Sequence, residues 1–316
     1  MLYNWMYNWK RIIDNLFKYI NLFKRNWRRI RDNLFKIIVL SLAILALTPL
    51  FHLIVVVFIN GLSTLLEAGW NFFVDLPPTP LSQRLGGIAP SLVGTFLLTL
   101  ISLPVTIALS LFTAILVTEF PKSKVSLVVD TIAKSLASVP TIAVSMVVFS
   151  LAVIIVNSVP GIRVYLSPAG SALLGSFALI IVALPFSYTY FSTFLRSVPF
   201  TYKEAAYSLG MSRWAVIMRV VIRVVKKSML VAVLMTMARI MGETAALLFT
   251  AGRYRSGVPA TILGPVDAIP LLIFDYILSP FEVWHRAAWG VTLILLLFYM
   301  LIFFIVKIGV KEVKLT

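Results

Sequence analysis

The sequence predicts an all-α membrane protein with six transmembrane helices, and three observations lead to this prediction. The 316 residues are 60% hydrophobic and only 13% charged, whereas a soluble domain is typically about a quarter charged. The mean hydropathy of the chain is +0.98. Six apolar stretches are each long enough to cross a hydrocarbon core of about 30 Å, which takes roughly 20 helical residues. These stretches cover residues 37–59, 88–117, 135–156, 173–195, 229–249 and 287–306.

The first 36 residues are predicted to form a basic amphipathic helix on the cytoplasmic surface of the membrane. Residues 11–18 recur with few changes at residues 29–36, a shift of 18 residues. That shift equals five turns of about 3.6 residues, so both copies present the same helical face. Lys and Arg on one side with Trp, Phe and Leu on the other are typical of helices that bind anionic lipid. A regulatory or partner-binding helix is the alternative. Residues 37–316 then form the transmembrane domain.

The basic residues predict that both termini lie in the cytoplasm. Lys and Arg accumulate in the cytoplasmic segments of membrane proteins. With the N-terminus inside, 22 of the 28 Lys and Arg residues fall in inner segments and five in outer ones. The same distribution argues against nucleic-acid binding despite the formal net charge of +16, because the charges flank apolar runs and form no single patch. With no Cys and two distant His residues, neither a metal site nor a resident cofactor is expected.

A polar loop at residues 196–228 carries more local structure than a simple connection between two spans requires. Thr201 and Glu204 have the spacing of a capping box, which would start a short helix. Gly210 is expected to end that helix in the left-handed conformation, and Ser212 is expected to cap a second helix.

The same loop resembles a known motif. Glu204, Ala205 and Ala206 precede Gly210, and this pattern resembles the EAA loop in the permease subunits of ABC importers. In that family the loop forms a coupling helix that seats in a groove of the ATPase subunit. The family pattern ends with Ile-x-Leu-Pro, whereas residues 220–223 here lack the Pro. The resemblance implies that these four residues couple the chain to an ATPase.

A nucleotide site on this chain itself is not expected. Residues 170–176 have the glycine spacing of a P-loop but carry Ser where the phosphate-binding Lys must stand. ATP and Mg²⁺ are therefore expected on a partner ATPase chain, and this chain is not expected to be an enzyme.

Arg239 and Glu243 place two opposite charges inside the fifth apolar stretch. A charge at the centre of a bilayer costs a few kcal/mol, so such residues usually pair and mark a functional path. The Arg fork matches the oxygens of an oxyanion. A nearby carboxylate accepts a hydrogen bond from protonated phosphate and repels fully deprotonated sulfate. An ion pair that only locks helices together is the alternative. Gly242 is expected to leave the backbone bare, and Thr244 adds a hydroxyl.

Residues 238–245, Ala-Arg-Ile-Met-Gly-Glu-Thr-Ala, are similar to the Ala-Arg-x-x-Gly-Glu-Thr-Ala-Pro segment of phosphate ABC transporter permeases of the A type, with Ala246 in place of the Pro. The matched Arg and Glu are implicated in phosphate passage in that family. The resemblance, which extends roughly over residues 75–316, implies the fold of a type I ABC importer permease. It also implies a complex in the prokaryotic cytoplasmic membrane, containing a homologous second permease, two ATPase subunits and an extracytoplasmic phosphate-binding protein. The implied substrate path contains Arg239, Gly242, Glu243 and Thr244.

Three alternatives stay open. The chain could belong to an importer for another oxyanion such as molybdate or phosphonate. It could instead be a channel or carrier that works alone, or a membrane sensor without transport activity. Glu119 is expected to be solvated or paired with Lys122. The outer loop at residues 253–284, with Asp267, Asp275 and Glu282, is either a surface for a substrate-binding protein or a structured cap.

Overall fold

The computed structural model describes the backbone of residues 2–158 and 170–310, and the side chains of residues 31–158 and 170–308. The described residues are helical, apart from loops and one isolated parallel bridge between Gly252 and Val266. The all-α prediction is therefore confirmed. The chain divides into two compact units, residues 1–58 and 59–316, and each is described by itself.

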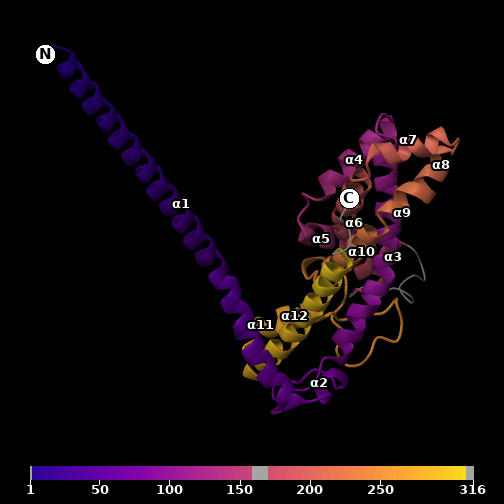
Figure 1. Cartoon of the computed structure of the whole chain (residues 1–316). Helices are drawn as coiled ribbons and strands as arrows, with labels where there is room; N and C mark the ends of the chain where they lie inside the picture. Colours follow the sequence, from indigo (N-terminus) through magenta and orange to yellow (C-terminus); the bar gives the residue numbers. More distant parts are fainter. Residues whose placement is uncertain (1, 159–169, 311–316) are drawn as a thin grey trace. The chain divides into compact units, whose positions relative to one another are not determined.

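The first unit consists of a single helix. Helix α1 runs without a break over Leu2–Ala68, and its last residues belong to the second unit (Figure 1). Its only internal proline is Pro49; the hydroxyl of Thr48 donates to the carbonyl of Ile44 at 2.8 Å. The predicted boundary at residue 36 is not a break in the backbone. That the first 36 residues lie on the membrane surface stays a prediction.

The second unit is a bundle of helices joined by loops (Figure 1). It also contains a π-helical turn at Ile217–Val221 and a 3₁₀ turn at Ala245–Leu247. The helices are α2 (Asn71–Val74), α3 (Ala89–Glu119), α4 (Lys124–Leu136), α5 (Thr141–Ser158), α6 (Ala172–Arg196), α7 (Phe200–Ser208), α8 (Arg213–Val216), α9 (Ile222–Val224), α10 (Lys226–Met241), α11 (Ile269–Ile277) and α12 (Glu282–Val310).

Five helices in the described part of the chain are long and apolar enough to cross a membrane, and they match five of the six predicted stretches. These are Arg31–Ala68, Ala89–Glu119, Thr141–Ser158, Ala172–Arg196 and Glu282–Ile308. The fifth predicted stretch differs, because α10 has 16 residues and stops at Met241. A continuous helix over residues 229–249 was therefore the wrong prediction. The third span also begins later than residue 135, because Pro140 disfavours helical geometry in the residue before it.

The centre of the bundle is the long contact between α3 and α6. The buried face of α3 carries hydroxyls every three or four residues. All but that of Ser91 return hydrogen bonds to their own helix, as Thr99 does to the carbonyl of Thr95 at 2.7 Å. Ser110 joins Ser187 of α6 at 2.7 Å. Small hydroxyl residues allow close helix contact where no water competes for hydrogen bonds. The buried hydroxyls of α3 belong to Ser91, Thr95, Thr99, Ser102, Thr106 and Ser110.

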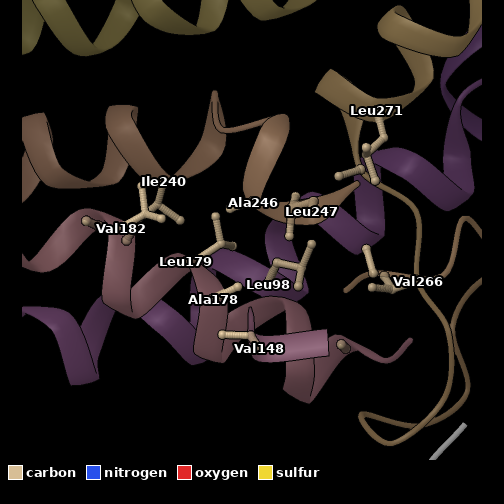
Figure 2. Close-up of a cluster of buried hydrophobic side chains, with 14 of the residues drawn as sticks. Leu98, Val148, Ala178, Leu179, Val182, Ile240, Ala246, Leu247, Val266 and Leu271 are labelled. Carbon is tan, nitrogen blue, oxygen red and sulfur yellow. The ribbon is translucent and has the colours of Figure 1, made fainter. Parts of the chain in front are cut away.

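An apolar cluster anchors the later helices to this pair. Leu98 of α3 and Leu179 of α6 meet Ile240 of α10, Leu247 of the 3₁₀ turn and Leu271 of α11 in it (Figure 2). Each of these five side chains is at most 2% exposed, so the cluster fixes where α10 ends relative to α3 and α6.

Candidate functional site

Helix α10 ends at the residues that the sequence predicts to line a substrate path. Helix α10 ends with Gly242 as its cap, and the Gly242 N–H donates to the carbonyl of Ala238 at 3.2 Å. Ile240 before the break and Leu247 after it are buried in the same apolar cluster (Figure 2). In a membrane, non-helical backbone is tolerated only where protein covers it or where it lines a cavity. Broken helices of this kind form the substrate sites of many transporters.

Arg239 and Glu243 meet across this break. Arg239 Nη1 lies 3.0 Å from Glu243 Oε2, and the two side chains are 34% and 6% exposed. Arg239 lies in the last turn of α10, where the helix dipole favours a positive charge. The predicted pairing is confirmed. Because Glu243 lies beyond the last helical residue, the pair links the helix end to the irregular segment and does not run along a helical face.

The guanidinium of Arg239 keeps unused donors. Its Nε is buried and has no hydrogen-bond partner within the described residues. Its Cζ lies 4.7 Å from the centre of the Phe186 ring of α6, close enough for a cation–π contact. Arg has five N–H donors in a planar fork, and one ion pair engages only part of them. The side chain is partly exposed, but the free Nε is buried, so an anion reaches this donor only when a neighbouring contact such as that with Glu243 opens.

Gly242 is packed closely against α12. A Cβ atom built on Gly242 would lie 1.8 Å from the hydroxyl oxygen of Tyr299 and 3.5 Å from the carbonyl oxygen of Ala238. The absent side chain therefore leaves room for the phenol. Thr244 is half-buried, and its carbonyl accepts the N–H of Leu247 at 3.1 Å. The structure thus gathers Arg239, Gly242, Glu243 and Thr244 at one helix end.

Sequence reasoning missed Phe186 and Tyr299. Tyr299 is the only tyrosine of the apolar stretch at residues 287–306, and that was a usable signal. Nothing local in the sequence shows that its hydroxyl reaches Gly242, because the contact joins α12 to α10.

The predicted coupling loop forms a short helix with a defined end. Helix α7 ends as expected at Gly210, which has φ +77°. The N–H of Met211 donates to the carbonyl of Ala206 at 3.2 Å, and the N–H of Gly210 donates to that of Tyr207 at 2.9 Å. These two bonds form a Schellman motif. The Ser212 hydroxyl accepts the N–H of Ala215 at 3.4 Å, so the predicted second cap is confirmed.

The predicted capping box is wrong. Helix α7 begins at Phe200, one residue before Thr201, and no side chain caps its first turn. Pro199 precedes it with φ −57° and ψ 138°. Because the Pro ring fixes φ, the chain turns into the helix at this residue without a hydroxyl cap.

The four residues predicted to couple with an ATPase divide between two faces. Glu204, Ala205 and Gly210 are exposed, whereas Ala206 is 3% exposed and belongs to the protein's own apolar core. Large apolar side chains around the exposed face are unusual for a surface in water and mark an interaction site. They include Phe200, Tyr202, Leu209 and Trp214, which are 65%, 46%, 83% and 58% exposed.

A buried ion pair attaches α7 to the end of α3. Lys203 Nζ lies 2.7 Å from Glu119 Oε1, and these side chains are 14% and 4% exposed. The prediction that Glu119 is solvated or paired with Lys122 is therefore wrong, because α7 folds back over the C-terminal end of α3. The pair borders a pocket of about 560 Å³ that is also lined by Lys122, Tyr207 and Arg213.

Two carboxylates of the predicted outer loop, Asp267 and Asp275, are neutralised within the protein. Asp267 is fully buried and accepts Arg255 Nε at 2.9 Å and the Ser91 hydroxyl at 2.5 Å. Arg255 Nη2 also donates to Asp275 at 2.7 Å. Burial alone would lower the pKa of Arg255, but Asp267 and Asp275 outweigh it and raise this pKa above its ordinary value. The network favours a structured cap over a free acidic surface.

Taken together, a bundle of membrane-length helices, a helix broken at an ion pair and an exposed EAA-type helix define a transporter subunit. A family model described as the inner membrane component of binding-protein-dependent transport systems matches residues 107–314. The chain belongs to this family of transport-system membrane components.

Within the family, the chain is similar to phosphate permeases. The probable phosphate transport system permease protein PstA of Methanocaldococcus jannaschii is 35% identical, over 87% of this chain and 92% of the relative. The PstA protein of Xylella fastidiosa strain 9a5c is 31% identical over 74% of this chain and 77% of its own length. That of Haemophilus influenzae is also 31% identical, over 70% and 75%. The predicted resemblance to phosphate-importer permeases is therefore confirmed.

The fold agrees with a solved transporter. A chain of the MetNI methionine ABC transporter superposes with a TM-score of 0.52 and 14% identity, over 71% of this chain and 94% of that chain. At this identity the likeness concerns the fold alone, and it confirms the predicted fold of a type I ABC importer permease.

Proposed function

We propose that the chain is a permease subunit of an ATP-driven importer of inorganic phosphate and forms the membrane path together with a homologous second permease. Its similarity to phosphate transport system permeases supports the substrate. The observation that carries the proposal is the Arg239–Glu243 pair at the end of α10, with the Nε of Arg239 unpaired. A cation with unused donors inside a membrane bundle marks a path for an anion.

The pair suits passage better than tight binding. Without an anion, Glu243 neutralises Arg239, so no unpaired charge stays buried. When phosphate arrives, the free Arg239 donors bind its oxygens, and the Glu243 carboxylate accepts the hydrogen bond of a P–OH group. Sulfate has no such proton, so the negatively charged carboxylate of Glu243 repels it. Conduction requires that the ion leave again. When the phosphate leaves, the Glu243 carboxylate pairs with Arg239 again.

ATP acts through the exposed face of α7. Glu204, Ala205 and Gly210 form the docking surface for a partner ATPase that holds ATP and Mg²⁺, and Ala206 holds α7 to the bundle. A phosphate-binding protein delivers the ion to the opposite side. Both termini lie in the cytoplasm, as the Lys and Arg distribution predicts, so α7 faces the ATPase there.

Uptake of radiolabelled phosphate into proteoliposomes tests the substrate path. The complex is isolated through a tag on this chain and supplied with enclosed ATP and loaded binding protein. Arg239→Gln is expected to lower uptake at least about tenfold, because it removes the cation of the path. Arg84→Gln, at an exposed arginine, is the matched control. Unchanged uptake by the Arg239 variant, or competition by sulfate or molybdate as strong as by phosphate, would refute the proposal.

Co-purification tests the coupling surface. Ala205→Glu is expected to release the ATPase from the tagged complex, since it places bulk and charge on the docking face. Ala260→Glu makes the same change at an exposed residue of the loop between α10 and α11 and is expected to retain the ATPase. Equal retention by both variants would show that the ATPase docks elsewhere.

A further inference from the structure

The phenol of Tyr299 lies beside the proposed substrate path. Helix α12 presents this half-buried side chain to the end of α10, where its hydroxyl takes the place that a side chain at residue 242 would fill. Gly242 stands between Arg239 and Glu243 in the chain, so the phenol that packs on Gly242 lies beside both charged residues at the end of α10. The contact spans α10 and α12, two helices that pack together.

The Tyr299 hydroxyl has no hydrogen-bond partner within the described residues. A phenol inside a protein usually finds one, and the Tyr299 oxygen is not among the fully buried unpaired atoms of the described residues, so a permeating ion can reach it. The hydroxyl of Tyr276 is also unpaired, but it lies in an apolar cluster with Phe72 and Leu272. What distinguishes Tyr299 is its position next to an arginine that likewise keeps a free donor.

We infer that Tyr299 is a third contact of the permeating phosphate: its hydroxyl donates a hydrogen bond to a phosphate oxygen held by Arg239, and Gly242 keeps the space for it open. This inference rests on the proposed phosphate path. Arg239 supplies charge, Glu243 recognises the P–OH group, and Tyr299 adds a neutral donor that orients the ion. A neutral donor also holds an anion less tightly than a second cation, which suits a site that must release its ion.

The role of Gly242 follows from the same geometry. A methyl group at this position would collide with the Tyr299 hydroxyl at 1.8 Å, whereas the next ring carbon lies at 3.0 Å. Gly242→Ala therefore displaces the hydroxyl, and Tyr299→Phe removes the colliding atom. If the hydroxyl is the functional group, the two substitutions are not additive, because each abolishes the same contact.

The experiment measures phosphate transported per ATP hydrolysed by the reconstituted complex. Tyr299→Phe is expected to lower this ratio by about three- to tenfold, the usual effect of losing one neutral hydrogen bond. ATP hydrolysis stimulated by loaded binding protein and the thermal stability are expected to stay unchanged. Tyr276→Phe removes another unpaired hydroxyl as the matched control and is expected to transport normally. The double variant Gly242→Ala/Tyr299→Phe is expected to transport no worse than Gly242→Ala alone.

The outcomes separate this inference from the proposed function. Normal transport by Tyr299→Phe together with failure of Arg239→Gln would overturn the role of Tyr299 and leave the phosphate path intact. Normal transport by Arg239→Gln would overturn the path itself. A loss of thermal stability in Tyr299→Phe with unchanged transport per ATP would show that the phenol is a packing group, which also refutes the inference.

Discussion

Replacing Lys203 by methionine would leave Glu119 buried without its partner. The two charged atoms lie 2.7 Å apart, with side chains 14% and 4% exposed. At this distance and an effective dielectric constant of about 20, Coulomb's law gives roughly 6 kcal/mol of attraction. The removal of both charges from water offsets most of this attraction, but the loss of only one partner strands the other charge and costs about 3–5 kcal/mol.

This change is expected to loosen α7, because the pair joins α7 to α3. A shift of about 3 kcal/mol corresponds to more than a hundredfold change in an equilibrium constant. Hydrogen exchange in peptides that cover α7 should therefore accelerate by about two orders of magnitude. Glu119→Gln should have a smaller effect, since the long Lys203 side chain can extend its ammonium to water. The double variant Lys203→Met/Glu119→Gln should restore most of the protection of α7 from hydrogen exchange, because it leaves no buried charge without a partner.

Lys134→Met is the matched control for this experiment. Lys134 also forms a 2.7 Å ion pair, with Asp130, but its side chain is 62% exposed. Exposed pairs contribute at most about 1 kcal/mol, so exchange in α7 should not change. Two results would refute the reasoning: an exchange rate for Lys203→Met equal to that of Lys134→Met, or a double variant as unprotected as the single one.

Three further predictions concern the loop between α10 and α11, α3 and α4. Arg255→Met should lower the thermal stability of the purified complex markedly, because it strands the fully buried Asp267; an effect no larger than that of an exposed arginine would contradict this. Gly94→Ala should also destabilise the complex, since its Cβ would lie 2.0 Å from the Asp267 carbonyl oxygen, whereas Gly257→Ala, with a nearest atom at 3.3 Å on a side chain, should not. Burial alone would raise the pKa of Asp130, but hydrogen bonds from Lys134 and Tyr188 lower it below its ordinary value. Its carboxylate therefore stabilises the fold fully above about pH 4, and this effect is lost as the pH falls through the lowered pKa. The stability deficit of Asp130→Asn should shrink over this range and disappear in melts recorded below that pKa.

The sequence predicted the features that depend on neighbouring residues. Five apolar stretches became helices of membrane length, because hydropathy and length alone decide whether a segment can cross lipid. Gly210 ended α7 and Ser212 capped α8, since such ends depend on one residue and its adjacent backbone. The Arg239–Glu243 pair also formed, because four residues separate its members.

Predictions from the local sequence pattern were wrong where a contact with a distant segment sets the helix end or the ion pair. Apolar character continues through residue 249, so hydropathy predicted one long helix, yet α10 stops at Met241. There the apolar cluster holds both sides of the break (Figure 2), and the phenol of Tyr299 covers Gly242. Similarly, Glu119 pairs with Lys203 and not with Lys122, because the pairing depends on how α7 folds over α3.

The sequence by itself determined that this chain is a membrane protein, which segments are long enough to cross, and which two charges lie within them. Only the tertiary structure decided that α10 is broken between these charges, that Arg239 keeps a donor free, and that Tyr299 lies beside them. The physical reason is range: burial in lipid and helix capping depend on residues a few positions apart. The surroundings of a buried charge depend on helices brought together by the packing of the whole bundle.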